Sequence, residues 1–400
     1  MTPHGAGGDI VMGGGSRGSV NFYSTGQPLK INGAPYTLID NVVFLATDVA
    51  AFPSGNDALA HDDVEGTAFT GTPIAVTFTG AFAGLGNRIS KLTTATNSTN
   101  QDEAMFARLG AGGTIEDLRL SDVSIHNGSG QTTDTAALAV LSSGTIRNVS
   151  VSGQVSSGGN GSIGGLVAVN GGSIANSSSA ASVSGTSDVT DLGGLVATNE
   201  GRIFQSFATG DVACGKYCDA GGLVGTNNNG GNIDQTYATG DVTGGDGCEA
   251  GGLVGFSVFD FTPNSIANSY ATGAVTGNGD GTALSGPRVG GFIGINSTTF
   301  ISTSYATGAP TATGTSFLVG GFVGEDDATG ANANDYWNKT TSGITNPAQG
   351  AGDPANDPGI TGLSGAQMRA GLPAGFDGAI WAQTPGVNFG LPYLIALPPR

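Results

Sequence analysis

Short apolar runs alternate with polar residues along most of this chain, and glycine or asparagine bounds most of the runs. The clearest run is Gly221-Gly222-Leu223-Val224-Gly225, and close copies of it recur along the chain. Six copies, beginning at Gly164 and ending with the one at Gly320, start 29, 28, 30, 39 and 30 residues apart. A period in this range indicates a repeat architecture, in which each unit stacks on the next.

Alignment of the units on the isoleucine that follows each copy brings chemically alike residues into columns. Beyond the isoleucine come a mostly amide position, a hydroxyl position and an aromatic position. If each unit forms one coil of a parallel β-helix, the members of a column lie about 4.8 Å apart on neighbouring strands. Stacked amides can then form hydrogen-bonded ladders. The four columns are Ile174, Ile203, Ile233, Ile266, Ile301; Asn176, Gln205, Gln235, Asn268, Thr303; Ser177, Ser206, Thr236, Ser269, Ser304; and Phe207, Tyr237, Tyr270, Tyr305.

The pattern predicts an all-β chain that forms a right-handed parallel β-helix, a solenoid of about ten coils. Stacked Ile, Leu and Val fill its interior, and the Gly-Gly pair makes the sharp corner between two sheets. One coil cannot bury its own apolar face, so stability comes from the neighbouring coils. A β-propeller is excluded because its blades need about 40 or more residues and four strands each.

The regular repeat does not extend over the whole chain, and its limits predict three regions. Residues 1–75 form N-terminal strands and an irregular, acidic excursion over 46–75. Residues 76–334 form the repeats, and residues 335–400, which contain both tryptophans and a short helix near 363–369, form a C-terminal cap. A cap is needed because an open terminal coil exposes an unpaired strand edge.

Composition narrows the classes of partner. The chain has 13 basic and 31 acidic residues, a formal charge of −18, which argues against nucleic acid and against an anionic membrane surface as partners. No apolar run reaches the 18 residues of a membrane-spanning helix. The first residues lack the basic and apolar regions of a signal peptide, so we expect a mature fragment of a longer protein.

The sequence of the repeat resembles that of a known family. Gly-Gly-Leu-Val-Gly followed by Ser/Thr-Tyr-Ala-Thr-Gly resembles the GLUG motif of bacterial surface proteins, and the segments before and after the repeats resemble those of filamentous-haemagglutinin-like exoproteins. The resemblance covers roughly residues 20–397. It implies a secreted or cell-surface adhesin of a Gram-negative bacterium, exported by two-partner secretion through an outer-membrane partner.

Few residues suggest catalysis. The three histidines form no His-Glu-x-x-His motif, so a zinc peptidase of that type is not expected. A β-helix that cleaves polysaccharide needs paired carboxylates on one face. Asp211 and Asp241, one repeat apart, are the best pair, but they also fit solvated turn residues, and no Lys or Arg column lies nearby. We therefore expect no enzyme, no cofactor and no metal. The candidate carboxylates are Asp117, Asp122, Asp188, Asp191, Asp211 and Asp241.

The three cysteines are more informative. Cys214 and Cys218 lie in one turn, and Cys248 aligns with Cys218 one repeat later. Stacking brings Cys218 and Cys248 within disulfide range, and a local Cys214–Cys218 bridge is equally compatible with the spacing. A zinc site generally needs four ligands, and Asp219 and Glu249 do not complete a convincing set. The pattern favours a disulfide that staples the loop in an oxidising compartment.

Two functions fit these observations. The first is an adhesin-like stalk without catalytic activity, whose loops contact a glycan or protein on a host cell, a neighbouring cell or the matrix; the longest excursion, Thr276–Arg288, is then the best candidate loop. The alternative is a polysaccharide-binding or polysaccharide-cleaving β-helix. In that case Tyr237, Tyr270 and Tyr305 form a ladder that contacts the sugar, provided that these rings are exposed.

Overall fold

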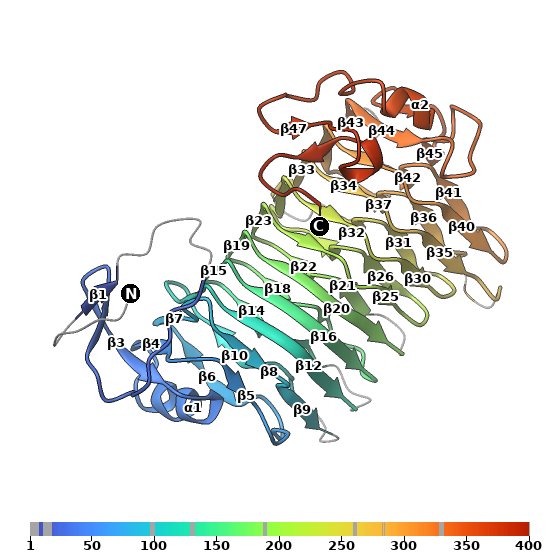
Figure 1. Ribbon diagram of the computed structural model, residues 1–400. Coiled ribbons are helices and arrows are strands. Elements are labelled where there is room, and N and C mark those ends of the chain that lie inside the picture. The colour runs from blue at the N-terminus through green and yellow to red at the C-terminus, as the bar shows by residue number, and fades with distance from the viewer. Residues whose placement is uncertain are drawn as a thin grey trace.

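The chain folds into stacked parallel coils. The computed structural model describes residues 8–10, 18–96, 101–128, 133–186, 190–258, 262–281, 283, 285–327 and 332–399. Strands make up 46% of the chain and helices 5%, and the coils form a β-solenoid of about nine turns. Figure 1 shows them as an elongated stack, with helix α1 at the blue end and the red C-terminal segment folded beside the last coils. The predicted parallel β-helix is confirmed, with a turn count close to ten.

Four sheets run along the solenoid, and we name them by their side chains. In the described chain their strands pair in parallel, apart from β2 with β3. The isoleucine sheet contains β1 (Gly8–Ile10), β2 (Leu29–Ile31), β3 (Ala34–Ile39), β4 (Asn56–Leu59), β7 (Ala81–Ala83), β11 (Thr114–Glu116), β15 (Thr145–Arg147), β19 (Ser173–Ala175), β23 (Arg202–Phe204), β28 (Asn232–Asp234), β33 (Ser265–Ala267), β38 (Phe300–Ser302) and β43 (Asn332–Ala333). The valine sheet contains β6 (Ile74–Phe78), β10 (Phe106–Leu109), β14 (Ala139–Ser142), β18 (Val167–Asn170), β22 (Val196–Asn199), β27 (Val224–Asn227), β32 (Val254–Ser257), β37 (Ile293–Asn296), β42 (Val323–Asp326) and β45 (Ala351–Asp353).

The other two sheets complete each coil. The aromatic sheet contains β5 (Asp63–Val64), β8 (Arg88–Ser90), β9 (Thr93–Thr96), β12 (Arg119–Asn127), β16 (Ser150–Ser157), β20 (Ser178–Gly185), β24 (Phe207–Ala208), β25 (Val212–Ala213), β29 (Tyr237–Ala238), β30 (Val242–Gly244), β34 (Tyr270–Ala271), β35 (Val275–Asn278), β39 (Tyr305–Ala306), β40 (Pro310–Thr313), β44 (Asp335–Asn338) and β46 (Ile360–Leu363). The acid sheet contains β13 (Thr135–Ala136), β17 (Ile163–Gly164), β21 (Thr190–Gly193), β26 (Cys218–Gly221), β31 (Glu249–Gly251), β36 (Arg288–Gly290) and β41 (Leu318–Gly320).

The Gly-Gly pair forms the corner between the acid sheet and the valine sheet, as predicted. A Cβ on Gly221 would lie 1.8 Å from the carbonyl oxygen of Val224. A Cβ on Gly222 would lie 2.2 Å from the carbonyl oxygen of Gly252 in the next coil. Both distances are far inside van der Waals contact, so the corner requires glycine. Leu223, immediately after the pair, is fully buried and turns into the interior.

The amide column forms a second corner, between the isoleucine sheet and the aromatic sheet. Its five residues all have left-handed backbones, with φ from 46° to 53°. Asparagine tolerates this conformation better than most residues, which explains why amides recur there. The Gln205 side-chain amide donates to Gln235 Oε1 at 3.0 Å, and Thr303 Oγ1 donates to Asn268 Oδ1 at 2.9 Å. The ladder that the sequence predicted therefore forms between these pairs of coils.

A second polar ladder lies at the end of the valine sheet, and the sequence analysis missed it. Asn170 Nδ2 donates to Asn199 Oδ1 at 2.8 Å, and Asn199 Nδ2 donates to Asn227 Oδ1 at 2.8 Å. All three side chains are fully buried. Their shared position, six residues after the first glycine of each repeat, was the signal that could have revealed them.

The N-terminal end departs from the irregular excursion expected over 46–75. Helix α1 (Val42–Ala51) covers the first coil with Val42, Leu45 and Val49 buried. Asn41 caps it by accepting the Phe44 N–H at 3.0 Å. Parallel stacking already begins with β3, which pairs with β4, and β4 in turn pairs with β7. Ten apolar-rich residues after an asparagine cap were the helical signal that the acidic composition obscured.

The C-terminal segment covers a side of the solenoid as well as its end. Strands β44, β45 and β46 continue the stack, and the chain then folds back over the outer face of the aromatic sheet. This last part contains α2 (Gly365–Met368), the 3₁₀ helix η1 (Asn388–Gly390), and an antiparallel pair formed by β47 (Trp381–Ala382) and β48 (Tyr393–Leu394). Its apolar residues pack against the tyrosine column.

Candidate functional site

The aromatic column is a packed core, so the exposure of its rings on which a sugar-contacting ladder depended is not found. Tyr237, Tyr270 and Tyr305 stack face to face, with ring centroids 4.9 and 5.1 Å apart. Their exposed fractions are 2%, 0% and 0% because Phe376 and Trp381 of the C-terminal segment lie against them. In this structure the rings offer no surface to a sugar.

The best predicted carboxylate pair caps backbone groups. Asp211 Oδ1 accepts the Asp241 N–H at 2.9 Å, and Asp241 Oδ1 accepts the Ala274 N–H at 2.8 Å. Each exposed aspartate thus joins its own corner to the next coil, which is the turn role that the sequence also allowed. Asp117 and Asp122 adopt left-handed backbones. The remaining candidates are Asp188, which lies outside the described residues, and Asp191.

Asp191 belongs to an outward-facing column of acidic residues that was not predicted from the sequence. In the acid sheet, Asp191 pairs with Asp219 and Asp219 pairs with Glu249, and we call these three residues the acid row. Thr226 Oγ1 donates to Asp219 Oδ2 at 2.9 Å and also lies 3.1 Å from Asp191 Oδ1. Thr198 Oγ1 donates to Asp191 Oδ2 at 2.7 Å. The side chains stand in the narrow corner between the acid and valine sheets.

Burial dominates the electrostatics of the acid row. It raises the pKa of Asp191 and Glu249, and it raises the pKa of Asp219 well above the ordinary value. The neighbouring charges of Glu249 and Asp191 raise the pKa of Asp219 further, because each disfavours a second negative charge beside it. The row ends at Arg288, which pairs with Glu249 in register and donates to Glu325 Oε2 at 2.7 Å.

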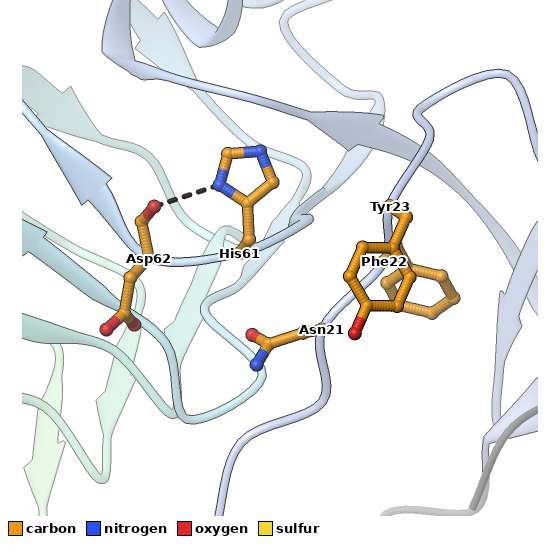
Figure 2. A pocket seen from close by; sticks show the side chains of 5 residues that line it. All are labelled: Asn21, Phe22, Tyr23, His61 and Asp62. Carbon is orange, nitrogen blue, oxygen red and sulfur yellow. Dashed lines mark hydrogen bonds between the residues drawn. The ribbon is translucent and has the colours of Figure 1, made fainter.

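A shallow hollow of about 480 Å³ lies beside the first coils (Figure 2). His61 is held there between two acceptors, with Nδ1 2.9 Å from the Asp62 carbonyl oxygen and Nε2 3.3 Å from Asp40 Oδ1. The described lining contains no serine, threonine or cysteine that this histidine could activate. The hollow therefore offers an imidazole and the exposed Tyr23 ring, without the arrangement of a nucleophile and its base. Its lining is Asn21, Phe22, Tyr23, His61 and Asp62.

The cysteines meet where the aromatic sheet turns into the acid sheet. Cys214 and Cys218 form a disulfide, which is one of the two pairings left open by the spacing. Cys248 is a buried free thiol with its Sγ 3.8 Å from Cys214 Sγ. The three sulfurs lie within 4.8 Å of one another. Stacking thus brings Cys248 to the bridge, as the alignment with Cys218 predicted.

The same turn belongs to a set of stacked loops, which we call the loop edge: the described residues of 214–217, 245–248, 279–287 and 314–317. The loops 214–217, 245–248 and 314–317 have the same length. The loop 279–287 is longer and lies within the predicted excursion Thr276–Arg288. Lys216 Nζ lies 2.6 Å from Asp280 Oδ2, and Asp246 Oδ2 accepts the Ala283 N–H at 2.6 Å. The loops therefore support one another across coils.

Two aromatic side chains project from the loop edge. Tyr217 is 39% exposed and Phe317 is 44% exposed. Tyr217 packs over Gly247 of the next coil, where a Cβ would lie 2.8 Å from its ring. Glycine there allows the ring to lie flat on the neighbouring loop. Aromatic surface thus reaches solvent on the loop edge, where one loop is also longer than the others.

Comparison with known proteins gives a weak structural match. No family model matches the chain, and no curated protein matches it. One solved structure that is similar is described as an IgA1 protease. It is 23% identical, with a TM-score of 0.43, and the match covers 68% of this chain and 22% of that chain. The chain therefore spans less than a quarter of the length of the protein that it matches.

This neighbour contradicts the expectation that the chain is not an enzyme, because the protein it resembles is one. We therefore withdraw the expectation that the chain lacks catalytic activity. At this identity and TM-score, the likeness carries no argument about a reaction of this chain. In addition, no helix in the described part of the chain is long and apolar enough to cross a membrane.

Proposed function

We propose that this chain is the β-helical shaft of a secreted or cell-surface adhesin, and that its loop edge contacts the partner. The exposed pair Tyr217 and Phe317 is the observation that carries the proposal. Aromatic residues are enriched in protein interfaces, and a few of them commonly carry most of the binding energy. On the loop edge these rings stand on loops held by contacts between coils, so little ordering is needed on binding.

Two other stacked columns, the tyrosine column and the acid row, support this assignment because other side chains cover them. The tyrosine column is covered by the C-terminal segment, and the acid row is enclosed by Thr198 and Thr226. The partner class is a glycan or protein of a host cell, a neighbouring cell or the matrix. The negative charge of −18 disfavours nucleic acid. The resemblance of the repeats to GLUG-motif exoproteins adds two-partner export from a Gram-negative bacterium to the proposal.

Binding of the purified chain to a glycan array and to immobilised cell-surface and matrix proteins tests the proposal. We expect the double variant Tyr217→Ala/Phe317→Ala to lose at least tenfold in affinity for any partner found. Phe300→Ala is the matched control, because Phe300 is an equally exposed ring, 52%, at the start of β38 in the isoleucine sheet. Equal loss in both variants, or no loss in the double variant, overturns the assignment to the loop edge.

Assays of peptide cleavage and of reducing-sugar release on the same preparation test for a reaction. Product formation that persists in the double variant would place the function elsewhere on the molecule. Loss of binding in the double variant, whatever these two assays give, is the result that the adhesin proposal expects.

A further inference from the structure

The three cysteine sulfurs converge with a fourth donor, the carbonyl oxygen of Gly215. This oxygen lies 3.2 Å from Cys248 Sγ and 3.8 Å from Cys218 Sγ. Cys248 Sγ lies 3.8 Å from Cys214 Sγ. Three of the six edges of a donor tetrahedron are therefore present, and Cys248 lies on two of them.

These edges have the size that zinc requires. With zinc–sulfur distances of about 2.3 Å and zinc–oxygen distances of about 2.1 Å, the ligands of a tetrahedral site lie roughly 3.5–3.8 Å apart. The edges formed by Cys248 and Gly215 fall near this range already. The Cys214 and Cys218 sulfurs are bonded to each other, so they must separate before both can bind a metal. The Cα atoms of these two residues are 6.5 Å apart, which leaves room for that separation.

The surroundings favour a bound cation over three free thiols. Cys218 and Cys248 belong to the apolar core of the solenoid, and the Cys218 N–H points at Cys248 Sγ at 3.3 Å, as in the hydrogen bonds that orient metal-bound thiolates.

We propose that the reduced chain binds one Zn²⁺ through Cys214, Cys218, Cys248 and the Gly215 carbonyl oxygen, and that the zinc-bound and disulfide-bonded states exclude each other. Thiolates are preferred zinc ligands, and the Gly215 carbonyl oxygen would take the fourth, harder position. A small-molecule thiol reduces the Cys214–Cys218 bond: two reductant thiols become one disulfide, and the two cysteines each gain a proton. Zn²⁺ then displaces the protons of three thiols, so binding releases three protons to solvent.

Metal titration of the reduced full-length chain tests the proposal, with Co²⁺ as the spectroscopic probe and Zn²⁺ as its competitor. We expect one Co²⁺ per chain, with the visible spectrum of a tetrahedral site and a thiolate charge-transfer band, and displacement by one Zn²⁺. The oxidised chain should give neither signal. Asp241→Asn, at an exposed corner of the aromatic sheet and outside both the donor set and the loop edge, is the control that should keep both.

The variants Cys248→Ser and Cys214→Ser separate a three-cysteine site from ordinary dithiol binding. Each should lose the charge-transfer intensity of one thiolate and at least tenfold in Zn²⁺ affinity, with circular dichroism confirming the fold. If one variant fails to fold, the other decides. Mass spectrometry after thiol alkylation adds a second readout, because Zn²⁺ should slow re-formation of the disulfide. A reduced chain that binds no metal, or unchanged binding without Cys248, would overturn the proposal.

Discussion

The tyrosine column and the acid row arise in the same way and have opposite energetic consequences. Both stand on the outer face of a sheet, and both place like side chains on neighbouring coils. The rings of Tyr237, Tyr270 and Tyr305 stack in parallel and bury a large apolar area together with the C-terminal segment. The carboxyl groups of Glu249 and Asp191 disfavour ionisation of Asp219, which lies between them.

The difference teaches that a period in the sequence fixes what is stacked but not whether the stack stabilises the fold. Stacking one aromatic ring on another stabilises the fold. Each carboxyl group in a stack instead needs a hydrogen-bond donor from outside its column. Thr226, which contacts both Asp191 and Asp219, is such a partner. Four changes test this contrast, and they follow here in order of expected size.

Trp381→Ala should produce the largest effect, a loss of about 3–5 kcal/mol in the free energy of unfolding, because it leaves a large cavity over the tyrosine rings. Chemical denaturation followed by fluorescence of the remaining Trp337 measures it. Phe389→Ala in the same segment, where the ring is 86% exposed, is the control and should cost less than about 0.5 kcal/mol. Equal effects would show that the segment contributes little to the column.

Asp219→Asn should stabilise the chain at neutral and higher pH, by about 1–3 kcal/mol, because it removes a poorly satisfied buried charge. The pKa of Asp219 is raised in the fold, so the fold holds this proton more tightly than the unfolded chain does. The contribution of Asp219 to the stability of the fold is therefore complete below about pH 4, and it is lost as pH rises through the raised pKa of this group. Thermal unfolding between pH 4 and pH 8 measures the difference, with Asp241→Asn, an exposed carboxylate, as control. Identical pH profiles for wild type and Asp219→Asn would contradict the prediction.

Tyr270→Phe and Tyr305→Phe should have opposite signs and magnitudes of about 1 kcal/mol. Within the described structure the Tyr270 hydroxyl is buried without a hydrogen-bond partner, so its removal should be neutral or stabilising. The Tyr305 hydroxyl donates to the Pro392 carbonyl oxygen at 2.6 Å and accepts from Asn388, so its removal should destabilise. Denaturation midpoints of the two variants, measured side by side, check this. Destabilisation by both would mean that the Tyr270 hydroxyl has a partner in solution.

Asp211→Asn should have the smallest effect, below about 0.5 kcal/mol, because an amide oxygen can still accept the Asp241 N–H. Asp211→Leu should cost more, since it leaves that N–H without its acceptor. Thermal unfolding of both variants at pH 7 distinguishes them. A large loss with asparagine would show that the charge of Asp211, and not only its hydrogen bond, stabilises the corner.

The sequence predicted the parts of this molecule that depend on one repeat and its neighbours. The isoleucine interior, the Gly-Gly corner, the amide corner and the approach of Cys248 to Cys218 all follow from adding one coil to the next. Burial of the tyrosine column does not follow, because the covering residues Phe376 and Trp381 lie 71 and 76 positions beyond Tyr305 and carry no periodic signal. Helix α1 was not predicted for a related reason. It packs on the first coil only, so it has no counterpart in the other repeats.

The acid row was not predicted because its members belong to different motifs in the sequence. Asp191 is a candidate catalytic carboxylate, and Asp219 and Glu249 follow cysteines, although strand pairing places all three in one column. The aligned repeats contained this information. What they could not supply is the degree of enclosure, which depends on how closely the acid and valine sheets approach at the Gly-Gly corner.

The Gly-Gly corner also restricts how the length of this molecule can vary during evolution. A Cβ at Gly222 would strike the next coil, and every ladder depends on the register that this corner sets. Removal or duplication of one whole repeat keeps all the columns aligned, whereas a single inserted residue at the corner shifts every side chain after it. The solenoid can therefore grow or shrink only in steps of one coil, about 4.8 Å each. Insertions of arbitrary length are confined to loops such as 279–287, so length and surface chemistry can diverge independently in related chains.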